Sequence, residues 1–411
     1  MHAVCISMDG RLDLDGLARL KTYFDTIGSH LSTQGRASFA TYAMGIFGDG
    51  ERKSVEPMAA RFACDPSSTQ REHDRLLYFL RVMPWSDTDV RREAAKMGID
   101  AMQSRGPISS WILDDTGFLK QGRHSVGVQR QYTGSAGKIA NCQLAVSLTV
   151  ANQFDQLPID MELYLPQSWA DGPMLRKKAQ IPKEISFRTK HEIAMDMVDR
   201  ALEQGVPRGV LLMDAWYGTH TKLRKHLSES GLQYAVGVNS NTPLFLVNKR
   251  RIGTTCTTAE TYAKALDRKK FRRICWRDGT GARLESFFHI TRVAVDYGSD
   301  DEPDLRQEWL IVEWPKDELR PSKYALSTLP VGLSKKRIVA TLQERWRTER
   351  AYEDLKGELG LDHFEGRSFP GWNHHVSVVL CCYAFVVAER IRAFPPSKTW
   401  SSYPAALSSA A

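Results

Sequence analysis

The sequence lacks the features that mark secreted, disulfide-stabilised or membrane-spanning proteins. It has seven cysteines, an odd number, and no Cys-x-x-Cys pair, so neither a disulfide framework nor a thiolate zinc site is supported. The longest apolar run, 376–388, is shorter than the roughly 20 residues that cross a bilayer. No basic stretch precedes an apolar run at the N-terminus, which argues against a signal peptide. We therefore expect a cytoplasmic protein.

Negative charge is also in deficit. The 411 residues include 56 Lys and Arg against 48 Asp and Glu, which gives a formal net charge of +8. Such a balance suggests an anionic partner. Residues 1–108 contain equal numbers of acidic and basic side chains, so the whole excess lies downstream. A surface that binds a polyanion is therefore expected mainly after residue 108.

The first quarter of the chain has a helical pattern. Apolar residues recur at helical spacing in 17–24, 39–47 and 76–82, and Gly and Pro residues separate these stretches. The length of the chain allows two or three domains. We therefore predict a helical N-terminal domain over 1–108.

Beyond residue 108 the pattern changes to strands that end in carboxylates. An apolar strand is followed by Asp114 and Asp115, and a second apolar strand, 209–213, is followed by Asp214. Further elements are expected between and after them, with strands at 141–150, 159–165 and 233–238 and helices at 190–204 and 218–231. Strands that alternate with helices predict an α/β core with a mixed sheet, and such sheets carry their sites at strand ends.

Residues 240–330 interrupt this alternation because they are rich in strand-forming residues, and we interpret them as a β-rich insertion domain. Their most basic cluster is 268–273 together with Arg277. Cations of this kind either protect a strand edge from aggregation or contact a nucleic acid. The pattern is equally compatible with both.

A single long helix is expected over 335–360. On it Arg345, Glu349, Tyr352 and Lys356 are spaced i, i+4, i+7 and i+11, which would place them in one polar stripe. A solvated face crossed by ion pairs would give the same spacing. The helix is followed by a second, apolar helix over 374–393 and by a tail from 395 that is rich in Pro, Ser and Ala and is expected to be flexible.

Three carboxylates on separate core elements suit a pair of divalent cations. Asp114 or Asp115 would supply the first, Asp214 the second and Glu349 the third. Magnesium prefers oxygen ligands, and two such ions can drive an in-line phosphoryl displacement. Arg345 and Lys356 would then bind the phosphate, the first as a bidentate fork and the second as a point charge.

At these positions the chain resembles DDE-type insertion-sequence transposases with a ribonuclease-H-like core, in the branch with the signature Tyr-x2-Arg-x3-Glu-x6-Lys. Here the signature becomes Leu342-x2-Arg345-x3-Glu349-x6-Lys356. The tyrosine is replaced by Leu342, so one phosphate contact is in doubt unless Tyr352 substitutes for it. The segments 114–117, 125–132, 213–218 and 360–368 are also similar to the family.

The resemblance implies a ribonuclease-H-like mixed-sheet core, metal-dependent cleavage at transposon ends and strand transfer into target DNA. It assigns Asp114, Asp214 and Glu349 to two Mg²⁺ or Mn²⁺ ions, and Arg345 and Lys356 to DNA phosphate. The expected partners are DNA and further copies of the chain, in association with the bacterial nucleoid. The expected N-terminal domain, 1–108, would recognise DNA ends. The catalytic core would comprise 109–239 and 331–394, with the insertion domain at 240–330 between its two parts and the flexible tail at 395–411.

Three alternatives remain open from the sequence. The family pattern selects Asp114 over Asp115, whereas strand alternation leaves the choice open. Asp115-Thr-Gly also resembles an aspartic protease loop, but such a site needs two paired carboxylates and only one such loop occurs. A DNA-binding protein derived from a transposase, without transposition activity, is the third alternative.

Overall fold

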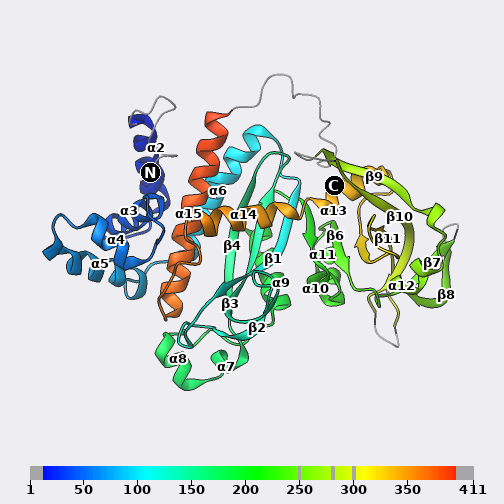
Figure 1. Ribbon diagram of the computed structural model, residues 1–411, viewed down its shortest axis with the longest axis horizontal. Coiled ribbons are helices and arrows are strands. Elements are labelled where there is room, and N and C mark those ends of the chain that lie inside the picture. Colours follow the sequence, from blue (N-terminus) through cyan, green and yellow to red (C-terminus); the bar gives the residue numbers. More distant parts are fainter. Residues whose placement is uncertain (1–12, 249–250, 279–282, 299–301, 395–411) are drawn as a thin grey trace. The chain divides into compact units, whose positions relative to one another are not determined.

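The computed structural model forms two compact units (Figure 1). It describes residues 13–248, 251–278, 283–298 and 302–394. Unit 1 contains the described residues of 1–108, 115–197 and 348–411, and unit 2 contains those of 109–114 and 198–347. The tail predicted over 395–411 lies outside the described residues. Among the described residues, no helix combines the length and the apolar character needed to cross a membrane.

The helices predicted in the first quarter of the chain are confirmed, and all belong to unit 1. They are α2 (Leu14–Ile27), α3 (Thr33–Phe47), α4 (Val55–Phe62), the 3₁₀ turn η1 (Pro66–Ser68), α5 (Thr69–Arg81) and α6 (Asp87–Arg105). Asp13, Ser32 and Ser86 begin three of these helices as N-caps that accept a backbone N–H. Such caps satisfy donors that have no partner within the helix.

Unit 1 also contains an antiparallel sheet. Its strands are the second half of β1 (Ser110–Leu119), β2 (Gln129–Thr133), β3 (Lys138–Ala151) and β4 (Gln156–Tyr164). β3 pairs with β2 over Lys138–Cys142 and with β4 over Leu144–Ala151. Residues 142–151 of β3 are buried, in agreement with the strand expected there. β2 lies in the polar, glycine-rich stretch where no strand was predicted.

The longest helix among the described residues, α15 (Phe369–Ala393), packs against α6 and β4 of unit 1. The remaining helices that begin in unit 1 or enter it are α7 (Gln167–Ala170), α8 (Pro173–Ala179), α9 (Lys190–Glu203), α14 (Trp346–Gly357) and α15 (Phe369–Ala393). α15 runs beside α6 (Figure 1). The carboxylate of Asp155, which is almost fully buried, pairs with Arg105 at 3.1 Å and with Arg390 of α15 at 2.9 Å. The bounds of α15 confirm the apolar helix expected over 374–393 and add one more turn at its start.

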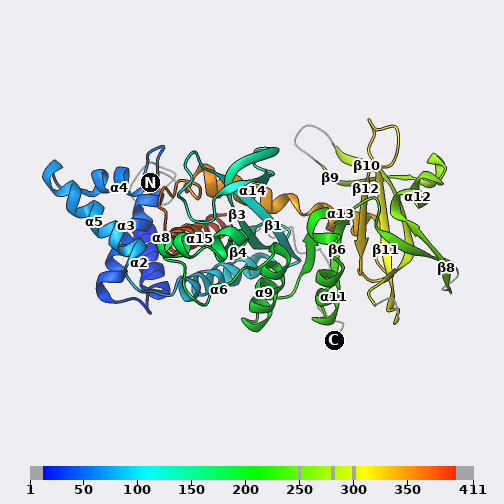
Figure 2. The same cartoon turned by 90° about the horizontal axis from the view of Figure 1, so that it is seen from below.

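Unit 2 is built on a mixed sheet, as the sequence predicts (Figure 2). Its strands follow the order β1, β5, β6, β12, β11, β10, β7, β8, with β9 paired to β10. The first three are parallel and the others antiparallel. After β1 the strands are β5 (Val210–Met213), β6 (Tyr234–Val238), β7 (Pro243–Asn248), β8 (Arg251–Thr258), β9 (Arg272–Asp278), β10 (Arg283–Asp296), β11 (Leu305–Trp314) and β12 (Lys323–Ser327).

The β-rich part of unit 2 has its own apolar core. Leu244, Val293, Leu310 and Leu326 are buried together there with eight other residues. The helices of unit 2 are short: α10 (Ala215–Gly218), α11 (Thr221–Glu229), α12 (Ala259–Lys264), the 3₁₀ turn η2 (Arg268–Lys270) and α13 (Lys335–Gln343). The strand content predicted for 240–330 is thus confirmed.

The prediction of one continuous helix over 335–360 is wrong. α13 ends at Gln343, α14 begins at Trp346, and Glu344 and Arg345 form a turn between them. The chain has no Gly or Pro here, so the sequence gives no signal for the break. The turn is held by tertiary contacts instead, because the side chain of Arg345 pairs with Asp114 and the ring of Trp346 stacks under Arg277. The helix is interrupted where these contacts form. Arg345 lies in the turn and Glu349 in α14, so the two residues do not lie on one helical stripe.

Candidate active site

The two predicted aspartates lie on neighbouring parallel strands. The strand that was expected to end at Asp114 and Asp115 continues to Leu119, so Asp114 lies midway along β1, whereas Asp214 directly follows β5. β1 and β5 pair with Ser110 opposite Val210 and Ile112 opposite Leu212. The same register, continued by two residues, brings Asp114 level with Asp214. Residues level in adjacent strands point to the same face, and adjacent strands lie about 4.8 Å apart. The continued register therefore brings the backbones of the two aspartates to neighbouring positions, with Asp214 just past the end of its strand.

Local structure holds Asp214 in this position. It is the N-cap of α10, and its Oδ1 accepts the backbone N–H of Tyr217 at 3.1 Å. The neighbouring strand β6 approaches this turn closely at Gly237. A methyl group added there would lie 2.8 Å from the nitrogen of Ala215, closer than real Cβ contacts. A side chain at 237 would therefore displace the backbone that carries Asp214.

A buried arginine, which was not predicted as a site residue, holds the other end of α10. Arg224, on α11, is 1% exposed. Its Nη1 donates to the carbonyl oxygen of Gly218, the last residue of α10, and its Nε donates to the hydroxyl of Tyr297 at 3.0 Å. The Tyr297 hydroxyl in turn donates to the buried carboxylate of Glu308. A cation and an anion in the core of unit 2 thus fix the turn after Asp214.

Arg345, predicted to bind phosphate, lies beside the first aspartate. Its Nη1 is 3.1 Å from Oδ2 of Asp114, whose side chain is 14% exposed, whereas the arginine side chain is 32% exposed. The guanidinium therefore lies at the more open side of the pair. A guanidinium in this place offers further N–H donors in a fork that matches a phosphate.

Asp115 has a different environment from Asp114. Successive residues of a strand point to opposite faces, so Asp115 points away from the face that carries Asp114. Its Oδ2 lies 2.6 Å from Nζ of Lys190, at the start of α9 in unit 1, and both side chains are about four-fifths buried. This ion pair accounts for the carboxylate of Asp115 without a catalytic role.

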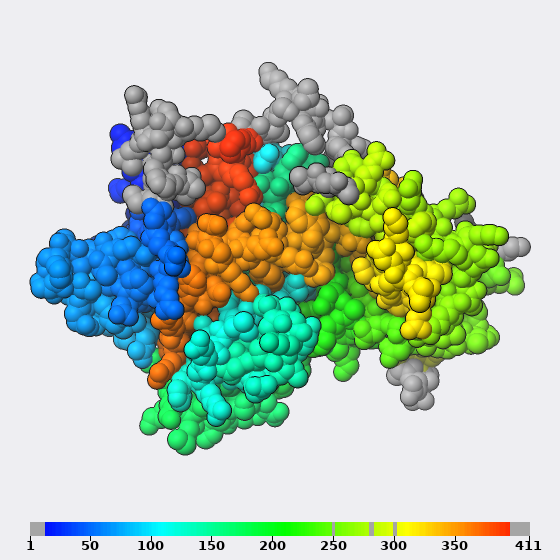
Figure 3. Space-filling model, viewed as in Figure 1, coloured from blue at the N-terminus to red at the C-terminus, as the bar shows by residue number. Residues whose placement is uncertain are grey.

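Glu349 belongs to unit 1, in the first turn of α14, and is exposed. The helix is bound to β3 on either side of it. Thr348 Oγ1 lies 2.9 Å from Oγ1 of Thr149, and the hydroxyl of Tyr352 lies 2.5 Å from Oγ of Ser147. Figure 3 shows α14 at the surface. Tyr352 is 9% exposed, so its hydroxyl serves the contact between α14 and β3.

Lys356, the second predicted phosphate ligand, also lies in unit 1. Its Nζ donates to the carbonyl oxygen of Gly117 at 2.8 Å and to Oγ of Ser135 at 3.2 Å. The ammonium also lies 5.3 Å from the ring centre of Phe118. Burial lowers the pKa of Lys356. These contacts bind the C-terminal half of α14 to β1 at Gly117, which follows Asp114 and Asp115 in the sequence.

In the part of the chain that the structure describes, no group of three or more His, Cys, Asp or Glu side chains is arranged to hold a metal ion. Asp114 and Asp214 belong to unit 2 and Glu349 to unit 1. The two aspartates thus lie on neighbouring strands of one unit, and Glu349 lies in the other unit.

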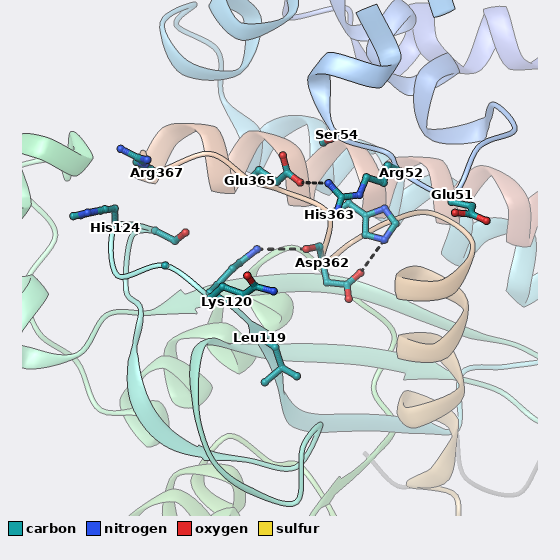
Figure 4. Close-up of a pocket in the computed structure, with 13 residues that line it drawn as sticks. Glu51, Arg52, Ser54, Leu119, Lys120, His124, Asp362, His363, Glu365 and Arg367 are labelled. Atoms are coloured by element: carbon teal, nitrogen blue, oxygen red, sulfur yellow. Dashed lines mark hydrogen bonds and ion pairs between the residues drawn. The ribbon is translucent and has the colours of Figure 1, made fainter. Parts of the chain in front are cut away.

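A cavity of about 650 Å³ opens elsewhere in unit 1 (Figure 4). Lys120 extends into its wall, where Nζ donates to the carbonyl oxygen of Phe364 at 2.7 Å. Figure 4 shows Arg52 near Glu365, and Asp362 near His363. The lining contains cations and carboxylates in similar number, and none of the five predicted site residues. This cavity is therefore not the predicted active site.

Comparison with known proteins gives matches to two families. The family described as "DDE superfamily endonuclease" matches residues 26–283, and the family described as "Transposase DDE domain" matches residues 188–385. A curated protein of Microchaete diplosiphon, named "Probable transposase for insertion sequence element IS701", is 27% identical over 205 residues. That match covers 50% of this chain and 49% of the relative, so the chain aligns with about half the length of the curated protein.

Proposed function

The chain belongs to the DDE superfamily endonucleases, and from this premise we propose that it is the transposase of an insertion sequence. It cleaves DNA at the transposon ends and joins the freed 3′-hydroxyl to target DNA. The curated relative named as a probable insertion-sequence transposase supports this proposal, as does the match to the transposase DDE domain.

One structural observation carries the proposal. Asp114, within β1, and Asp214, just after β5, lie on adjacent parallel strands, at level positions when the printed register of 110–112 with 210–212 is continued by two residues. Two carboxylates that share a site repel each other. Asp114 is partly compensated by Arg345, and Asp214 by a backbone N–H. A divalent cation between them would compensate both.

The donor set fits a hard cation. Asp114 and Asp214 offer carboxylate oxygens, which suit Mg²⁺ or Mn²⁺ rather than a thiolate-binding metal. Glu349, exposed on a helix that is anchored to β3, would be the third ligand. When bound, two such ions activate water or a 3′-hydroxyl and stabilise the leaving oxygen. We assign Asp114, Asp214 and Glu349 to this role.

The cations nearby would bind and orient the DNA strand. Arg345 is placed to bind a phosphate oxygen while it remains beside Asp114. Lys356 has three N–H donors, and its two described hydrogen bonds leave one for a phosphate. Leu342 occupies the place of the family's tyrosine and offers no hydroxyl, so we propose that this phosphate contact is absent.

The other assignments follow from the same proposal. The helices of 1–108 would recognise the transposon ends, 109–239 and 331–394 would form the ribonuclease-H-like core, and 240–330 would form an insertion domain. Transposon ends and target DNA would be the partners, near the nucleoid, in an active complex of several copies of the chain.

The test uses the purified protein and a labelled duplex that carries the DNA flanking its gene. With Mg²⁺ or Mn²⁺ we expect cleavage at the outer edge of a terminal inverted repeat, which leaves a free 3′-hydroxyl. Excess EDTA should stop the reaction, and added Mg²⁺ should restore it. A protein that binds this duplex but cuts it with neither ion would be a DNA-binding protein without transposition activity. Cleavage that survives EDTA would exclude the metal-dependent reaction.

A further inference from the structure

Unit 2 has an exposed basic surface, which we call the β9–α13 face. Two short segments form it: the end of η2 with the start of β9, and the first turn of α13. All of its six cationic residues are exposed: Lys270, Arg272, Arg273, Lys335, Lys336 and Arg337. The first three belong to the basic cluster whose role the sequence left open.

The two segments lie together in space. α13 packs against β9, and Figures 1 and 2 both show the two elements side by side. Their N-terminal ends meet near His289. Burial lowers the pKa of this histidine, and the charges of both Lys335 and Lys270 lower it further. The two lysines are therefore within electrostatic reach of one imidazole.

The other end of β9 leads to the candidate active site. The guanidinium of Arg277 lies over the ring of Trp346, 4.1 Å from its centre. Trp346 follows Arg345, which pairs with Asp114 at 3.1 Å. All of these residues belong to unit 2. Positive charge therefore extends along β9 and α13 from Lys270 and Lys335 to the first aspartate.

Stability of the fold does not account for the cations of α13. Its first turn contains Lys335, Lys336 and Arg337 and no acidic residue. Cations at the positive end of a helix dipole are unfavourable. Within the described residues, the only ion pair made by the six cations of this face joins Arg273 and Glu285, at 3.4 Å. Edge protection explains arginines on β9, which among the described strands pairs with β10 alone, but it does not explain three cations on a helix.

From this arrangement we propose that the β9–α13 face binds the sugar–phosphate backbone of double-stranded DNA next to the bond that is cleaved. The seven residues of β9 span roughly 23 Å at about 3.3 Å per residue. This length corresponds to about six or seven base pairs at 3.4 Å each. The six cations lie at the N-terminal ends of β9 and α13, so the face would hold the duplex about half a turn away from the strand end at Asp114.

The chemistry of the face favours duplex backbone over other polyanions. Arg and Lys bind phosphate without regard to base sequence. Single-stranded nucleic acid is held by exposed aromatic side chains on which bases stack. Of the aromatic side chains at β9, Phe271 is buried and Trp276 is half-buried. The position of the face next to a cleaved bond rests on the proposed function. Binding of duplex DNA can be measured without cleavage, so the binding proposal and the proposed function can fail independently.

The experiment compares two triple variants of equal charge. Lys335→Gln/Lys336→Gln/Arg337→Gln removes three cations from the face. Lys177→Gln/Lys178→Gln/Lys183→Gln removes three exposed cations from unit 1 and serves as the control. Fluorescence anisotropy with a labelled 20-base-pair duplex gives Kd from 50 to 300 mM salt. A single strand of the same length and an RNA duplex are measured in parallel.

We expect the face variant to bind the duplex about a hundredfold more weakly than wild type at 0.1 M salt. The slope of log Kd against log salt should fall by about 2.7, because three cations are removed and each phosphate contact contributes about 0.9. Its Tm should stay unchanged or rise, because the replaced cations oppose the helix dipole. The control should change neither affinity nor slope by as much. An unchanged slope in the face variant, or a loss confined to single strands or RNA, would overturn the proposal, whereas the proposed function depends on the separate cleavage assay.

Discussion

Replacement of Asp114 by alanine is expected to abolish cleavage of transposon-end DNA while DNA binding persists. Asp114 lies level with Asp214 in the register of β1 and β5, and loss of one carboxylate removes a ligand from the proposed metal pair. Metal ions supply several kcal/mol of transition-state stabilisation, so the rate should fall at least about a hundredfold. Binding should persist or strengthen, because a negative charge is removed from the DNA-facing side. A gel assay that measures binding and cleavage on the same duplex checks both results.

Asp115→Ala is the matched control. Its carboxylate lies 2.6 Å from Lys190 on the opposite face of the strand, so this variant should lose an ion pair and a little stability but keep cleavage. Loss of cleavage in Asp115→Ala together with full cleavage in Asp114→Ala would assign the catalytic role to Asp115 instead. Thermal unfolding of both variants shows whether either result comes from a damaged fold.

Replacement of Arg224 by methionine is expected to give the largest loss of stability. The arginine is 1% exposed and so is Glu308, and the hydroxyl of Tyr297 bridges them. Burial already raises the pKa of Glu308, and removal of the cation would leave that carboxylate uncompensated. Breaking a buried pair in this way costs about 3–5 kcal/mol. For a unit of this size the Tm should fall on the order of 10 °C.

The double variant Arg224→Met/Glu308→Leu is the control for this interpretation. When both charges are replaced by apolar side chains, neither is left buried without a partner, so most of the lost stability should return. A double variant that loses the sum of the two single effects would show that the charges do not interact. Cleavage by the double variant should stay low, because the carbonyl of Gly218 has lost its donor and the turn that carries Asp214 is less constrained.

The elements that could be predicted from the sequence are those marked by a pattern of apolar residues within the element itself. The apolar runs before Asp114 and Asp214 identify β1 and β5 because a buried strand needs a short apolar run. The carboxylates follow those runs directly. In contrast, β2 contains polar, half-exposed residues and gives no such signal. Its pairing with β3 is determined by the neighbouring strand.

The other differences arise from contacts between distant parts of the chain. The break at Glu344 and Arg345 depends on Asp114 and Arg277, which lie more than sixty residues away in sequence. Strand alternation alone could not choose between Asp114 and Asp115, whereas the structure shows that Arg345 pairs with Asp114 and Lys190 with Asp115. The role of Arg224 was missed for the same reason, since a single arginine in a short helix gives no sign that it is buried.

The central claim is that Asp114, Asp214 and Glu349 hold divalent cations together, and Mn²⁺ binding tests it most directly. Electron paramagnetic resonance can count the Mn²⁺ ions bound by the protein in complex with a transposon-end duplex. The comparison uses wild type, Asp214→Asn, Glu349→Gln and, as an exposed control on the same helix, Glu353→Gln. We predict that Asp214→Asn and Glu349→Gln each lose bound Mn²⁺ while Glu353→Gln matches wild type. Binding by Glu349→Gln equal to that of wild type would contradict the account.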